Sequence, residues 1–295
     1  MMRTVKDALA RRATGLVAAL PGLLVAVIVV GLFLKSRAIL GVAPLSKLLF
    51  SPAWHPVKGE FGLLPFIAGT VWVTVTAMVL AVPVSILAAV YLSEYAPRGV
   101  REAAKPVVDL LAGLPSVVYG VWGVLLVVPF VSGVLAPLAG VYSSGYSILA
   151  GGIVLAVMSF PTIIHVTLEV FTAVPRSLRD ASLSLGATKW ETTRRVVLRK
   201  GAPGILAAAV LGFSRAFGET MAVLMVVGNV PAVPRSLFDP GYPLPALIAN
   251  NYGEMMSIPR YDAALMTAAL VLMLIVLFFN IVARRFLARV ERRSR

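Results

Sequence analysis

Residues 177–201 read SLRDASLSLGATKWETTRRVVLRKG, a basic and amphipathic segment that lies between long hydrophobic stretches. Two capping-box patterns, in which a hydroxyl side chain is followed three residues later by an acid, open two predicted helices: Ser177 with Asp180, and Thr188 with Glu191. Gly186 lies between them and is a typical helix stop. The segment is therefore predicted to be a helix–turn–helix that projects from a membrane bundle and docks onto a partner.

The composition places the chain among membrane proteins. Of its 295 residues, 59% are hydrophobic and only 14% are charged, and the mean hydropathy is +0.91. Soluble domains carry about 25% charged residues. Six apolar segments are long enough to cross a bilayer, which needs about 20 residues: residues 13–34, 66–92, 110–131, 147–170, 205–227 and 263–282. The predicted fold class is an all-α membrane protein with six transmembrane helices.

The distribution of charge predicts the topology. The formal net charge is +14, and most lysines and arginines outside the predicted spans lie in the two termini and in the loops at 93–109 and 171–204. Cytoplasmic loops of membrane proteins carry the excess of Lys and Arg, so both termini and the 177–201 segment are predicted to be cytoplasmic. Topology thereby explains the basic charge, and nucleic acid is not predicted as a partner.

The sequence lacks the patterns of several kinds of active site. It contains no cysteine, which excludes disulfides and thiolate-bound metals, and it has no His-Glu-x-x-His motif. It has no Gly-Lys dipeptide, so a Walker A phosphate loop is absent and the chain is not by itself a P-loop ATPase. We predict no catalytic residue, metal or cofactor in this chain. If ATP drives transport, ATP and Mg²⁺ bind another polypeptide.

A polar run, GFSRAFGET at residues 212–220, interrupts the fifth predicted span. An arginine at mid-membrane costs at least about 2.5–3.5 kcal/mol on insertion scales, so Arg215 is expected to face protein or water. Arg215 and Glu219 are spaced i, i+4 and are predicted to share a helix face and to pair. Two interpretations stay open: a structural ion pair, or a substrate pathway in which Arg215 meets an anion, with Ser214 and Thr220 beside it.

Two further patterns concern how the spans pack. Small residues recur at four-residue spacing in the fifth span and predict close contact with another helix: Ala208, Gly212 and Ala216. In the fourth span, His165 and Glu169 are also four apart and are predicted to form either a proton relay or a polar pair at the interface. Asp109 is expected to face the lipid headgroups or Lys105.

The 177–201 segment resembles a known family motif. The run Asp180-Ala-Ser-x-x-x-Gly186, followed by Val196-x-Leu198, is similar to the EAA loop of importer-type ABC permeases. Arg199 stands where that loop usually has proline, which leaves the end of its second helix less defined. The resemblance implies that the loop seats in a groove of an ATPase through residues of its helices and turn: Asp180, Ala181, Gly186, Ala187, Trp190 and Glu191.

Further segments narrow the resemblance to the permeases of phosphate ABC importers, and within them to the PstC type. They are Gly69-Thr70 and residues 61–66, 91–97, 111–120, 174–178, 212–229 and 236–240, so the resemblance covers about residues 53–285. It implies a type I ABC importer permease fold. It divides the chain into a tail, first helix and external loop at 1–65, a permease domain at 66–285, and a basic cytoplasmic tail at 286–295.

The resemblance also implies a function and a set of partners. The expected function is that of a permease subunit of an ATP-driven phosphate importer in the inner (cytoplasmic) membrane. The implied partners are membrane lipid, a PstA-like permease subunit, a PstB-like ATPase dimer and an external phosphate-binding protein. The alternatives are an ABC permease for another oxyanion such as sulfate or molybdate, and an ion-coupled secondary carrier. A membrane scaffold without transport is less favoured because of Arg215.

Overall fold

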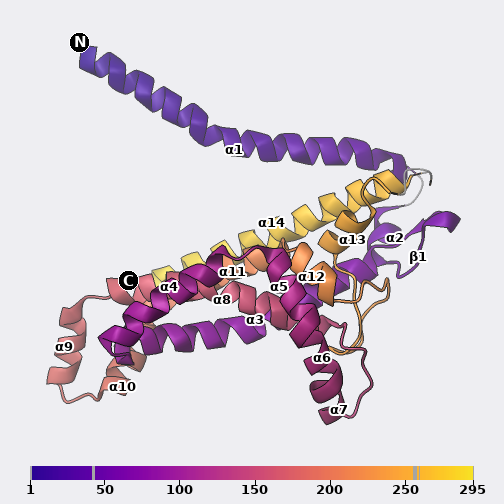
Figure 1. Ribbon diagram of the computed structural model, residues 1–295. Helices are drawn as coiled ribbons and strands as arrows, with labels where there is room; N and C mark the ends of the chain where they lie inside the picture. Colours follow the sequence, from indigo (N-terminus) through magenta and orange to yellow (C-terminus); the bar gives the residue numbers. More distant parts are fainter. Residues whose placement is uncertain (1, 42–43, 255–257, 259, 295) are drawn as a thin grey trace.

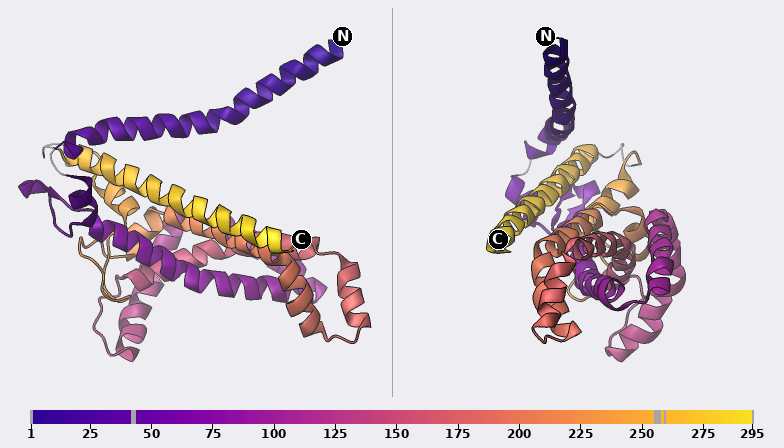
Figure 2. Two further views of the ribbon diagram at one scale, coloured as in Figure 1. Left: turned by 180° about the vertical axis from the view of Figure 1, so that it is seen from behind. Right: turned by 90° about the vertical axis from the view of Figure 1, so that its left-hand side faces the viewer.

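The computed structural model describes residues 2–41, 44–254, 258 and 260–294 (Figure 1). Long helices lie side by side in one bundle. The exception is α1 (Met2–Leu40), which meets the first turns of α14 (Tyr261–Ser294) and then diverges from the bundle toward the N-terminus (Figures 1 and 2). In the described part of the chain the strands are β1 (Trp54–His55) and β2 (Glu60–Phe61), which pair antiparallel around η1 (Pro56–Lys58).

Within the described residues, six helical segments are long and apolar enough to cross a membrane, the number that the sequence predicts. They are Ala10–Leu40, Leu64–Tyr95, Ser116–Leu138, Ile148–Ala173, Lys189–Phe217 and Tyr261–Val290. The predicted basic tail from residue 286 continues α14 as helix as far as Ser294. The domain limits themselves stay predictions.

The predicted start of the third span at residue 110 is wrong. α4 (Arg98–Gly113) ends before Pro115, and α5 (Ser116–Trp122) begins after it. Proline disfavours helical backbone in the residue before it, and Leu114 is accordingly extended, with φ −66° and ψ 133°. The span then continues through short α-helical and π-helical segments: η3 (Gly123–Val127), α6 (Val128–Phe130), η4 (Val131–Leu135) and α7 (Ala136–Leu138).

The fifth span also differs from its predicted limits of 205–227. A continuous helix forms from α10 (Lys189–Thr192), η5 (Thr193–Val197) and α11 (Leu198–Phe217). The second helix of the 177–201 segment therefore runs directly into the span, and Arg199 does not end it. The span stops at Phe217, and after a break at residues 218–220 the chain resumes as the short α12 (Met221–Val226).

The centre of the bundle is built from α3 (Leu64–Val90) and α8 (Ile148–Ala173), which pack closely against each other. A Cβ atom at Gly152 of α8 would lie 2.5 Å from the Thr76 side chain of α3, so only glycine permits this approach. α11 packs on the same helix: a Cβ at Gly212 would lie 2.7 Å from Ile163. Ala208, Gly212 and Ala216 are all buried, which confirms the predicted small-residue contact.

The two ends of the bundle carry different elements (Figure 1). One end holds α2 (Leu45–Phe50), the β-hairpin and α13 (Leu244–Asn251), and the other holds α9 (Arg176–Ser184) and α10. At the first end, aromatic rings pack edge to face around Trp54, which therefore lies within a protein cluster: Phe61, Phe66 and Tyr261 contact it, and Tyr242 contacts Phe66. The helix–turn–helix is thus separated from this cluster by the length of the bundle.

Candidate coupling and transport sites

The turn between α9 and α10 has the geometry that the sequence predicts for Gly186. This residue has φ +83°, a left-handed conformation that favours glycine. The Gly186 N–H donates to the Leu183 carbonyl at 2.9 Å, and the Ala187 N–H donates to the Ser182 carbonyl at 3.3 Å. These two bonds form a Schellman motif, which satisfies the last carbonyls of α9 and redirects the chain into α10.

One of the two predicted capping boxes is present. The Thr188 hydroxyl accepts from the Glu191 N–H at 3.2 Å, and the Glu191 carboxylate accepts from the Thr188 N–H at 3.0 Å. The predicted box at Ser177 is wrong, because α9 already begins at Arg176, with Pro175 as its N-cap and no side-chain cap bond. Proline fixes the φ of its own position in the range that suits a helix start, so the helix begins earlier than the hydroxyl pattern indicates.

The helix–turn–helix presents its side chains outward. Asp180, Ala181 and Gly186 are exposed, Trp190 is 53% exposed, and Ala187 and Glu191 are partly buried. Three leucines of α9 and the turn are also exposed: Leu178, Leu183 and Leu185. The segment therefore combines a rigid turn with an apolar surface that is not packed against the rest of this chain.

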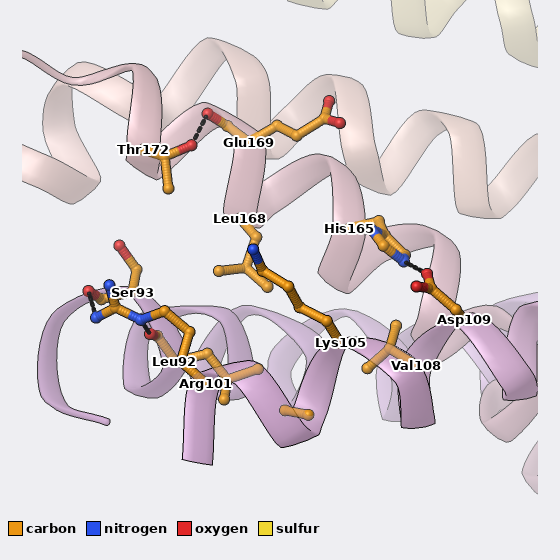
Figure 3. A pocket seen from close by; sticks show the side chains of 11 residues that line it. Leu92, Ser93, Arg101, Lys105, Val108, Asp109, His165, Leu168, Glu169 and Thr172 are labelled. Carbon is orange, nitrogen blue, oxygen red and sulfur yellow. Dashed lines mark hydrogen bonds and ion pairs between the residues drawn. The ribbon is translucent and has the colours of Figure 1, made fainter. Parts of the chain in front are cut away.

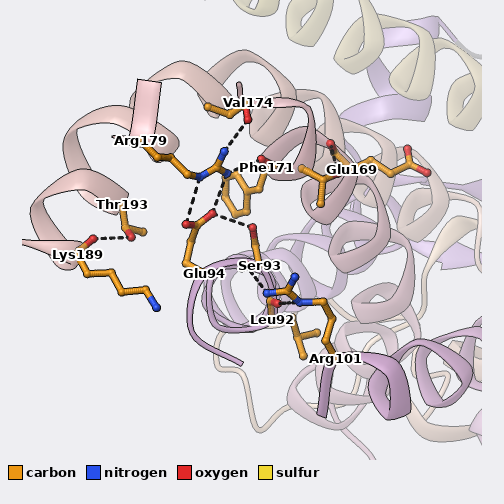
Figure 4. A network of polar contacts seen from close by, with 11 residues as sticks. Leu92, Ser93, Glu94, Arg101, Glu169, Phe171, Val174, Arg179, Lys189 and Thr193 are labelled. Atoms are coloured by element: carbon orange, nitrogen blue, oxygen red, sulfur yellow. Dashed lines mark hydrogen bonds and ion pairs between the residues drawn. The ribbon is translucent and has the colours of Figure 1, made fainter. Parts of the chain in front are cut away.

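A partly buried ion pair, which no sequence pattern predicts, joins this segment to the end of α3. Arg179 of α9 donates to the Glu94 carboxylate at 2.9 Å from Nη2 and at 3.3 Å from Nε, and their side chains are only 17% and 10% exposed (Figure 4). Glu94 belongs to η2 (Tyr91–Tyr95), a π-helical turn that continues α3. The two residues are 85 positions apart, so no local spacing pattern connects them.

The predicted pair of Arg215 and Glu219 is absent from the described contacts. The helix ends at Phe217, so the two residues no longer share a helix face. Arg215 instead donates from Nη1 to the Thr162 hydroxyl of α8 at 2.9 Å, and Glu219 accepts from the Ala222 N–H at 3.2 Å, at the start of α12. The assumption of a continuous helix through Gly218 caused the error.

The other two predicted pathway residues point to different neighbours. The Ser214 hydroxyl donates to Asn280 of α14 at 2.9 Å, and the Thr220 hydroxyl makes a long bond of 3.4 Å to the Gly218 carbonyl within the break. Ser214 therefore contributes to helix packing. Arg215, Glu219 and Thr220 lie in or next to the break and are partly buried.

Two short helices that each follow a break pack against each other. They are α5, which begins after Pro115, and α12, which begins after the break at residues 218–220. A Cβ atom at Gly120 of α5 would lie 3.3 Å from Ala222 of α12. On the α5 side, the Tyr119 hydroxyl donates to the Leu111 carbonyl of α4 at 2.6 Å and so bridges the break at Pro115. Irregular backbone at membrane depth is tolerated where protein or a water-filled cavity satisfies its polar groups.

A separate cavity of about 390 Å³ lies between α4 and α8 (Figure 3). His165 and Asp109 form a 2.6 Å contact on its wall, so His165 pairs with Asp109 and the predicted partner Glu169 only lines the same cavity. Lys105 reaches across the cavity toward Leu168 (Figure 3). In the described contacts Asp109 bonds His165 and not Lys105, and its side chain is 63% exposed, so the expectation that it faces the lipid headgroups stays a prediction.

Comparisons with known proteins identify the family. A family model described as "Binding-protein-dependent transport system inner membrane component" matches residues 81–295. The probable ABC transporter permease protein YqgH of Bacillus subtilis (strain 168) is 37% identical over 87% of this chain and 82% of its own. The phosphate transport system permease protein PstC of Mesorhizobium japonicum is 36% identical over 83% of this chain and 79% of its own.

Solved structures agree on the fold. The inward-facing MetNI methionine ABC transporter superposes with a TM-score of 0.60 at 20% identity, covering 77% of this chain and 95% of that one. A bacterial alginate ABC transporter gives a TM-score of 0.58 at 16% identity, covering 79% of this chain and 81% of that one. The protein is thus a multi-pass membrane protein with the type I ABC importer permease fold. It belongs to the family of binding-protein-dependent transport system inner membrane components, and within that family to the PstC-type permeases.

Proposed function

We propose that this chain is the permease subunit of an ATP-driven importer of inorganic phosphate. The observation that carries the proposal is the continuous helix from Lys189 to Phe217, which joins the exposed turn at one end to Arg215 at the other. At about 1.5 Å per residue this helix is about 43 Å long, enough to cross the hydrocarbon core. A movement imposed on the exposed turn therefore reaches the residues of the break directly.

The exposed segment docks onto the ATPase in this proposal. Residues of α9, the turn and α10 form the contact: Asp180, Ala181, Gly186, Ala187, Trp190 and Glu191. The left-handed Gly186 and the capping box at Thr188 support it, because both fix the angle between α9 and α10. ATP and Mg²⁺ bind the partner, a PstB-like ATPase dimer, and this chain supplies no nucleotide site. The segment and both termini lie in the cytoplasm.

The substrate path passes the break at residues 218–220. Arg215 is partly buried, and in the described contacts its guanidinium bonds a neutral hydroxyl rather than a carboxylate. An anion could therefore complete its coordination, and the planar guanidinium suits phosphate oxygens. Glu219 and Thr220 line the same break, and Ser214 supports it through α14. A PstA-like subunit provides the other half of the path, and an external phosphate-binding protein delivers the substrate.

Uptake into proteoliposomes tests this function. The full complex, with both permease subunits, the ATPases and the binding protein, is reconstituted and supplied with ATP and labelled phosphate, with sulfate or molybdate as competitors. The expected result is ATP-dependent phosphate uptake that neither competitor suppresses. Uptake that follows an ion gradient without ATP would indicate a secondary carrier. Preferential uptake of sulfate or molybdate would assign the permease to another oxyanion.

A further inference from the structure

Apolar burial contributes little to the position of α9. None of the nine residues from Arg176 to Ser184 is buried, and Leu185 in the following turn is 89% exposed. A helix of this kind is held in place mainly by its covalent connections and by specific polar contacts. The polar contacts of α9 therefore decide how firmly a force applied to it reaches the bundle.

Arg179 provides the densest set of these contacts. In addition to the two bonds to Glu94, its guanidinium donates to the Phe171 carbonyl at 2.8 Å and to the Val174 carbonyl at 2.5 Å (Figure 4). Both carbonyls lie at the C-terminal end of α8, where a cation is also favoured by the helix dipole. One side chain of α9 thus binds the ends of both α3 and α8.

Glu94 is held equally firmly on its own side. Its Oε1 atom also accepts from the Ser93 hydroxyl at 2.9 Å. Arg101 of α4 donates to the carbonyls of Leu92 and Ser93 at 2.8 and 2.7 Å, which fixes the π-helical turn that carries Glu94 (Figure 4). The turn is therefore a rigid acceptor for Arg179.

A second contact joins η2 to the other half of the helix–turn–helix. The Lys189 ammonium at the start of α10 lies 4.9 Å from the centroid of the Tyr95 ring, within the range of a cation–π interaction. Beside these polar contacts, a buried apolar cluster joins the same helix ends. Its members are Ala89 and Val90 of α3, Phe171 of α8, Val174 at the C-cap of α8, and Val197 of η5. Both arms of the helix–turn–helix thus converge on the end of α3.

We infer that the Glu94–Arg179 pair is a positioning element that makes α9 move as one body with the ends of α3 and α8 during transport. The inference rests on the proposed function, because it assumes that the ATPase pushes on α9. The exposed surface of α9 receives the force, and the partly buried Glu94–Arg179 pair passes it to α3. Without the pair, α9 shifts against the ends of α3 and α8, and only the helix from Lys189 to Phe217 still carries the movement to the break near Arg215.

The first test removes both charges, because a single substitution would leave the other charge partly buried and without its partner. The variant Arg179→Met with Glu94→Gln is reconstituted as the full complex. Its matched control removes an exposed ion pair, Arg98→Met with Glu102→Gln on α4, whose side chains are 92% and 63% exposed. ATPase recovery, basal ATP hydrolysis, hydrolysis stimulated by the phosphate-loaded binding protein, and phosphate uptake are measured.

The expected result is selective loss of coupling. Stimulated hydrolysis and uptake should fall about tenfold or more, within the roughly 5- to 150-fold range of coupling between distant sites. Basal hydrolysis and ATPase recovery should match those of the control. Normal stimulation and uptake in the charge-free variant would overturn the inference. A wild-type complex that imports no phosphate would instead refute the proposed function, whatever the variants do.

A second test replaces the ion pair by a covalent link. It also decides the question if the charge-free variant fails to assemble. The natural chain has no cysteine, so Glu94→Cys with Arg179→Cys adds the only two thiols to it. A short bis-methanethiosulfonate reagent, which forms a disulfide with each thiolate and releases methanesulfinate, joins them in a complex whose other subunits lack accessible cysteine. Cross-linking should restore stimulated hydrolysis and uptake, and reduction should abolish both. An assembled, cross-linked complex that stays inactive would show that the two residues must separate, which contradicts the inference.

Discussion

Replacement of Gly186 isolates the contribution of one backbone conformation to ATPase docking. This residue has φ +83°, and no heavy atom lies within 4 Å of the position that a Cβ atom would take. An added Cβ therefore meets no clash in this chain, and the effect of Gly186→Ala within this chain is the strain of a left-handed backbone. The matched control is Gly99→Ala in α4, where the added Cβ also meets open space and the backbone is helical.

The size of the effect follows from that geometry. A left-handed conformation costs a non-glycine residue roughly 1–2 kcal/mol. If the docked turn must keep this conformation, the ATPase should bind Gly186→Ala about 5- to 30-fold more weakly. Gly186→Asn should bind more tightly than Gly186→Ala, since asparagine tolerates the left-handed region better.

The assay is a titration of purified ATPase onto the permease heterodimer in lipid nanodiscs, with binding measured for each variant. Gly99→Ala should bind the ATPase as the wild type does. Wild-type affinity in Gly186→Ala would refute the backbone argument. Binding by Gly186→Asn that is no tighter than that of Gly186→Ala would also refute it, because tolerance of the left-handed region would then not decide the outcome.

Three further changes test the packing and the path. Thr70→Val removes the hydroxyl that accepts from the buried Leu244 N–H at 2.8 Å, and should destabilise the folded chain by about 1–3 kcal/mol, seen as a lower thermal midpoint that Thr70→Ser largely restores. Gly212→Val places a Cβ 2.7 Å from Ile163 and should lower the same midpoint by overpacking worth about 1–3 kcal/mol. Arg215→Gln should abolish phosphate uptake while ATPase recovery stays normal; uptake at the wild-type rate would remove Arg215 from the path.

The sequence by itself determined the membrane class, the number of spans and the local geometry of the docking segment. Span number follows from stretches of apolar residues, which the bilayer requires whatever their neighbours are. The turn at Gly186 and the cap at Thr188 also follow from short-range chemistry, because the groups that bond lie within a few residues of each other. The same local logic failed at Ser177, where the preceding Pro175 starts the helix first.

The tertiary structure decided which side chains meet across the bundle. The partner of Arg215 is Thr162, 53 positions away, and that of Arg179 is Glu94, 85 positions away. The first contact depends on how α11 lies against α8, and the second on how α9 lies against η2 at the end of α3. The break after Phe217 is also a tertiary outcome, since a single glycine inside a helix costs only about 1 kcal/mol. A cost of that size does not by itself determine whether a helix ends, so the packing of the neighbouring helices determines where α11 ends.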